Sequence, residues 1–134
     1  MNKISNMPGR LAEMIQQELH NVRLYRVLSR SAPNDRDRQT LEEFSDDCQD
    51  TADEFMRMYR KMTGYPFRPE PIPLKENGSY QHVLHERIRE EIRLSKRYRH
   101  EYLNTGDNYS LRRTFFNAYH TALEHAVGIM ELLH

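Results

Sequence analysis

Four stretches of this 134-residue chain place apolar residues three or four positions apart, and this spacing constrains the fold more than any other feature. Residues with this spacing lie along one face of an α-helix, so each stretch predicts an amphipathic helix with one buried side. The expected helices cover about residues 8–31, 34–63, 79–103 and 108–133. The sequence therefore predicts an all-α chain that folds as a single domain over residues 1–134.

The connection between the second and third expected helices, residues 64–78, differs from the other two in length and composition. It carries four of the six prolines, at positions 66, 69, 71 and 73, and such a segment is extended and stiff. Its central thirteen residues, 65–77, reach roughly 40 Å when extended, about the length of a 26-residue helix. The other two connections are short and make their helices antiparallel. We therefore expect a four-helix bundle of two antiparallel hairpins joined by a long crossover, the connectivity of ferritin-like bundles.

The two expected hairpins also resemble each other in sequence. Apolar residues, a glutamate and a tyrosine of the first helix recur 73 positions later in the third, as Leu11, Ile15, Glu18 and Tyr25 followed by Leu84, Ile88, Glu91 and Tyr98. Matching the glutamate as well as its apolar neighbours predicts an internal duplication. This repeat places Glu18 and Glu91 at equivalent positions of the two hairpins.

Glu18 and Glu91 interrupt their apolar stripes near the middle of each helix. A buried carboxylate without a partner carries a large desolvation cost, so each needs a counterpart. One interpretation is that the two are protonated or hydrogen-bonded to Tyr25, to Tyr98 or to each other. With His125 nearby, either the glutamates share a proton or one ionised glutamate pairs with a charged imidazole. The other interpretation is that both point at a metal ion.

The ordered set of motifs is similar to the rubrerythrin-type, di-iron carboxylate branch of the ferritin-like superfamily. The set extends over residues 9–133. In the first hairpin, a helix carries Glu and then Tyr seven residues on, and the second helix ends in YRKMTG at 59–64. After the proline-rich crossover, the third helix carries Glu91 and YRxxYL at 98–103, and the fourth carries FFxA at 115–118 and EHA at 124–126. The resemblance implies one Glu on each of helices one and three and a Glu-x-x-His pair on each of helices two and four, six ligands for two irons.

Three of those six ligands are absent from this chain. Glu18, Glu91 and His125 match, whereas Cys48 and Thr51 occupy the second-helix pair and Ala122 replaces the fourth-helix glutamate. The missing glutamates are those that the resemblance implies as bridges, so we expect no intact di-iron centre. Glu18, Glu91, His125 and Cys48 remain as a candidate set of four ligands for one iron or zinc.

Composition narrows the functional classes. Twenty basic and twenty acidic residues leave a formal net charge of zero, which gives no general attraction to nucleic acid or to an anionic membrane. The chain has no apolar run of membrane-spanning length, and its single cysteine fits a reducing compartment, so we expect a cytoplasmic protein. The preferred hypothesis is a non-enzymatic bundle without a cofactor, with a structural, regulatory or partner-binding role, and a homodimer is one form of such partnership. The alternative is an oxidoreductase or iron-handling protein with an altered mononuclear site.

Overall fold

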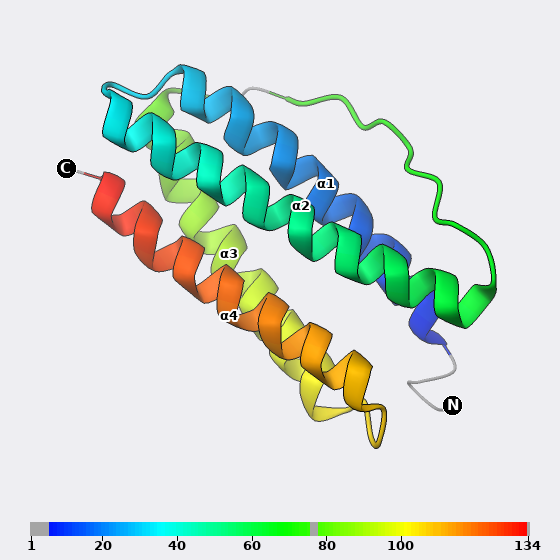
Figure 1. Cartoon of the computed structure of the whole chain (residues 1–134). Coiled ribbons are helices and arrows are strands. Elements are labelled where there is room, and N and C mark those ends of the chain that lie inside the picture. The colour runs from blue at the N-terminus through cyan, green and yellow to red at the C-terminus, as the bar shows by residue number, and fades with distance from the viewer. Residues whose placement is uncertain (1–5, 76–77, 134) are drawn as a thin grey trace.

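The computed structural model describes residues 6–75 and 78–133, and within them the chain forms four long helices and no strands (Figure 1). The helices are α1 (Met7–Arg30), α2 (Asp35–Thr63), α3 (Tyr80–Leu103) and α4 (Tyr109–Leu132). The expected all-α four-helix bundle is confirmed, and each helix begins and ends within one residue of its expected range. Parts of the predicted domain and crossover, at residues 1–5, 76–77 and 134, lie outside the described residues.

Local sequence signals explain where three of the helices begin and end. The side chains of Asn34 and Ser79 accept hydrogen bonds from the backbone N–H three residues on, and so cap α2 and α3. Asn108 caps α4 in the same way. Gly64, with a φ of 79°, ends α2 in the left-handed conformation that glycine adopts without strain. These boundaries position the buried faces of the helices relative to one another.

The helices form two antiparallel hairpins, α1 with α2 and α3 with α4, and the hairpins meet chiefly between α2 and α4. The crossover leaves the end of α2 and runs along the outside of α1 to the start of α3, so that α2 and α3 are parallel (Figure 1). It is attached to α1 by side chains: Gln16 exchanges two hydrogen bonds with the backbone of Glu70, and Arg23 donates to the carbonyl of Ile72.

The core is divided into two apolar clusters along the bundle. One is centred on Met14, Phe55 and Phe115, and the other on Val22, Leu41 and Ile129. Charged and polar side chains are buried between and beside them, and they form the candidate site described below. None of the helices in the described part of the chain is both long enough and apolar enough to cross a membrane.

Candidate functional site

The four sequence-predicted site residues converge in the middle of the bundle. Glu18 comes from α1, Cys48 from α2, Glu91 from α3 and His125 from α4, and each of the four residues is at most 5% exposed. Their polar atoms are contacted by other side chains of the bundle, most of them buried. What these neighbours supply decides the chemistry of the site.

Glu18 lies in a neutral environment. The hydroxyl of Tyr98, on the other hairpin, donates a hydrogen bond to its carboxylate, and the thiol of Cys48 is its second hydrogen-bonding neighbour. Burial, reinforced by the negative charge of Glu91, raises the pKa of Glu18 from 4.5 to about 7. Burial also raises the pKa of the Cys48 thiol and of the Tyr98 hydroxyl well above their usual values. This half of the site therefore holds its groups close to their uncharged forms.

Glu91 lies in a charged environment. One oxygen accepts from Nη2 of Arg87 at 3.4 Å, and the other is 2.7 Å from Nδ1 of His125. Nε2 of the same imidazole is 2.9 Å from Asp47 Oδ2. Although burial alone would lower it, these two carboxylates raise the pKa of His125 from 6.5 to about 9. The contact expected of a glutamate paired with a charged imidazole is therefore present between Glu91 and His125.

Arg87 is the second cation of the site, and it is only 4% exposed. Its Nε donates to the Tyr25 hydroxyl at 3.4 Å, and its guanidinium lies over the Tyr25 ring, 5.2 Å from the centroid. Glu91 and the half-exposed Asp47 supply the two carboxylates that pair with the two basic groups, Arg87 and His125. The charges balance without Glu18, which is why that residue can keep a proton.

Aromatic rings wall the charged half. The Phe44 ring lies 4.4 Å from the imidazole of His125, and the Tyr25 ring packs edge-on at 5.8 Å, measured between centroids. Gly128 makes room for Phe44, because a Cβ built there would lie 2.5 Å from the tip of that ring. The rings help to bury the ion pair of His125 with Glu91 and flank the imidazole between its two carboxylates.

This arrangement does not fit a metal ion. Both ring nitrogens of His125 are already paired, Glu91 is engaged by a guanidinium, and Glu18 and Cys48 are in conditions that favour their protonated forms. A metal requires these donors to be deprotonated and free, and it would lie beside two cations. Within residues 6–75 and 78–133, no group of three or more His, Cys, Asp and Glu side chains is placed to hold a metal ion. The mononuclear site stays a prediction.

The positions that lack the expected ligands behave differently from one another. Cys48 and Ala122 are buried on inner faces, as the stripes predict. Thr51 is only partly buried and lines a crevice between α2 and α4 together with Asp47.

Sequence reasoning missed Arg87 and Asp47. Arg87 lies four residues before Glu91, a spacing that permits an ion pair on a helix, but the spacing does not show that the pair is buried. Asp47 is half exposed, with 48% of its side chain accessible, and stands among other acidic residues of α2. Nothing in the sequence distinguishes it from them.

Comparison of the chain with family models, with curated proteins and with solved structures gave no match.

Proposed function

We propose that this protein is a metal-free, non-enzymatic bundle of the ferritin-like kind that acts as a structural or regulatory protein by binding a protein partner. The observation that carries the metal-free part of this proposal is the pairing of Arg87 with Glu91. In the centre of the bundle, the guanidinium of Arg87 places a positive charge beside Glu91, as a bound metal ion would do. Together with the imidazole of His125 it pairs with the buried carboxylate of Glu91.

Metal analysis tests this part directly. We expect protein purified without chelator to hold no iron or zinc, and its thermal midpoint to be unchanged by either metal or by chelator. A bound metal would instead stabilise the fold by mass action, by about 2.7 kcal/mol at a hundredfold excess over the dissociation constant. One equivalent of metal per chain, lost together with stability in the Glu91→Gln variant, would contradict the proposal.

The outer face of α4 supports the partner-binding part. Four apolar side chains lie along it at heptad-like steps, each from 37% to 58% exposed: Phe116, Leu123, Val127 and Met130. They span about 21 Å of helix. We call this row the α4 stripe. A row of large apolar side chains on one exposed face is the pattern of a helix that packs against another helix.

The charges of α4 favour a second copy of this chain as the partner. This helix has only four charged residues, and they are segregated, with Arg112 and Arg113 near its start and Glu124 and Glu131 near its end. Two α4 helices packed antiparallel about a twofold axis would bring the basic end of each to the acidic end of the other. In that register Phe116 faces Val127 of the second copy, and Leu123 faces the second copy's His120. The helix dipoles are also antiparallel in this arrangement.

Light scattering coupled to size-exclusion chromatography tests the dimer. We expect a dimer that Val127→Glu converts to a monomer with unchanged helix content, whereas the matched substitution Met62→Glu, at an exposed methionine of α2, leaves the dimer intact. Arg113→Glu should weaken the dimer, and adding Glu131→Arg should restore it. A monomer at all concentrations, or a Val127→Glu dimer, would contradict the second copy as the partner.

One observation favours the alternative, an iron- or zinc-binding oxidoreductase or iron-handling protein. Glu18, Cys48, Glu91 and His125 do converge from four helices. If metal binds, Arg87 must leave Glu91, and the metal analysis above would detect the site.

A further inference from the structure

A crevice that shares Arg87 with the buried ion pairs lies between α1 and α3, on the side that the crossover follows. Its volume is about 750 Å³, within the range of small-molecule sites. The helices α1 and α3 belong to different hairpins, and the main contacts between the hairpins are those of α2 with α4. The crevice is therefore lined by side chains of α1 and α3 that face each other. Apart from Arg87, the residues that line it take no part in the proposals on metal and on the dimer, so the crevice has no assigned role.

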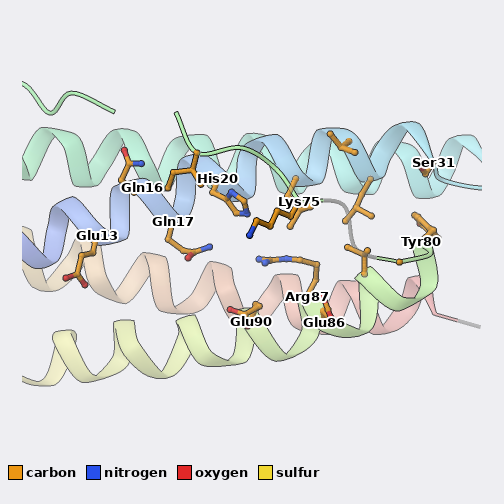
Figure 2. A pocket seen from close by; sticks show the side chains of 16 residues that line it. Glu13, Gln16, Gln17, His20, Ser31, Lys75, Tyr80, Glu86, Arg87 and Glu90 are labelled. Atoms are coloured by element: carbon orange, nitrogen blue, oxygen red, sulfur yellow. The ribbon is translucent and has the colours of Figure 1, made fainter. Parts of the chain in front are cut away.

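The side chains of His20, Lys75 and Arg87 line the same part of the crevice. Figure 2 shows the amino end of Lys75 and the guanidinium of Arg87 directed into the same space beside His20. Burial, with the positive charges of Arg87 and Arg23, lowers the pKa of His20, as expected where the potential is positive. Arg87 uses Nε and Nη2 for its contacts in the core, and no described residue accepts a hydrogen bond from its Nη1.

The acidic residues of the rim do not neutralise this part of the crevice. Glu13 pairs with Arg97, Glu86 with His82, and Glu90 with Arg93. In the described ranges 6–75 and 78–133, no carboxylate is within ion-pairing distance of Lys75 or His20. Lys75 therefore brings a positive charge with no described carboxylate beside it. Arg87, whose charge is paired with Glu91 in the core, offers its free Nη1 as a hydrogen-bond donor in a nearly dry environment, where a charge-assisted hydrogen bond to an anion is strongest.

Beyond the basic residues the crevice becomes apolar. Leu24, Val27 and Leu28 from the last turns of α1 face it on one side, and Val83 from α3 faces it on the other. This apolar floor continues for about 10 Å along α1, from Leu24 to Ser31. The geometry points to a ligand with a carboxylate at one end and an unbranched apolar chain behind it. We propose that the crevice binds a medium-chain fatty carboxylate, with its headgroup on Arg87 and Lys75 and its chain between Val27 and Val83.

Calorimetric titration of the full chain with decanoate, and with decanol as the uncharged match, tests the headgroup. We expect saturable binding of one decanoate per chain and at least tenfold weaker binding of decanol, since charge-assisted hydrogen bonds would be lost. Lys75→Gln should weaken decanoate roughly two- to fivefold, the range for a solvent-exposed ion pair, without changing decanol binding. Lys96→Gln, an exposed lysine of α3 outside the crevice, is the matched control and should change neither.

A second pair of variants tests the two ends of the site. Val83→Trp fills the apolar end and should abolish binding of both ligands. Arg87→Met combined with Glu91→Gln removes the cation and its buried partner together, so that the fold is retained, and should weaken decanoate tenfold or more. Equal affinity for decanol and decanoate, unchanged binding in Lys75→Gln, or no saturable binding would overturn the proposal. Lys75 and Val83 are neither candidate metal ligands nor part of the proposed dimer surface, so the outcomes for Lys75→Gln and Val83→Trp are independent of those two proposals.

Discussion

The two halves of the predicted repeat bury the same residue, a glutamate, and solve its desolvation in opposite ways. Burial raises the pKa of Glu18 towards neutrality, and its carboxyl group accepts a hydrogen bond from the Tyr98 hydroxyl. Glu91 instead forms ion pairs with Arg87 and His125. If the two halves of the repeat were equivalent, the Tyr25 hydroxyl would donate a hydrogen bond to Glu91, as the Tyr98 hydroxyl does to Glu18. Arg87 stands between them instead and contacts both.

The comparison connects the difference between the two halves with one cation, Arg87. Met14 occupies the position of α1 that corresponds, 73 residues earlier, to Arg87. With methionine there, the Glu18 half has no fixed positive charge of its own and holds a proton. With arginine there, the Glu91 half becomes an ion-pair network.

Arg87→Met should make the two halves alike, and it has the largest expected effect. It leaves Glu91 buried with one cation fewer, which should lower the free energy of unfolding by about 3 to 5 kcal/mol. Denaturant unfolding measures the loss. Combining it with Glu91→Gln should recover most of that loss, as a double-mutant cycle would detect. Additive effects in the cycle would mean that the two residues do not act as a pair.

Glu18→Gln keeps the shape of the neutral half and removes its titration. In the wild type the folded pKa of about 7 lies above the model value of 4.5, so the folded state holds a proton that the unfolded state releases. The stability of the wild type should therefore fall as the pH rises from 4.5 to 7. The variant should match the wild type near pH 4.5 and exceed it above pH 7, by on the order of 3 kcal/mol. Unfolding curves across this range test it, and a variant less stable than the wild type at pH 8 would contradict it.

Asp47→Asn should loosen the charged half at its solvent-exposed end. His125, with its pKa raised from 6.5 to about 9, contributes stability that is present below pH 6.5 and lost as the pH rises through 9. Removing Asp47 should lower that pKa, measured by NMR titration of the imidazole, and cost less than about 1 kcal/mol, because the aspartate is half exposed. The matched control is Asp46→Asn, at an exposed neighbour. Equal effects of the two variants would refute the role of Asp47.

Cys48 should give the smallest effect. Because its thiol is buried and its pKa is well above the usual value, we expect no reaction with a thiol reagent in the folded protein and full reaction after unfolding. Cys48→Ala should cost about 1 kcal/mol or less, since Cys48 acts as a small apolar residue whose hydrogen bond to Glu18 is weak. Rapid labelling under native conditions would show that α2 presents another face to the core.

The helices could be predicted from the sequence because the stripes, Gly64, Asn34 and Ser79 are local signals. The gathering of Glu18, Cys48, Glu91 and His125 was predicted from their places in the helical stripes together with the family resemblance. Arg87 could not be placed in the same way, because it and Ile88 both fit the period of the α3 stripe. Which of the two enters the core depends on the groups that meet it from other helices, Tyr25 and Glu91. Such convergence is a tertiary property and leaves no periodic mark.

The crossover has a consequence for the speed and order of folding. Each hairpin closes over a turn of a few residues, so most contacts are local and of low contact order. The crossover is the one long link, and it must be brought to α1 before Gln16 and Glu70 can meet. The pairs Tyr98 with Glu18, Arg87 with Tyr25 and His125 with Asp47 each join opposite hairpins. These contacts form only when the two hairpins dock, so docking of the hairpins and dehydration of the buried polar groups should form a single rate-limiting, cooperative step.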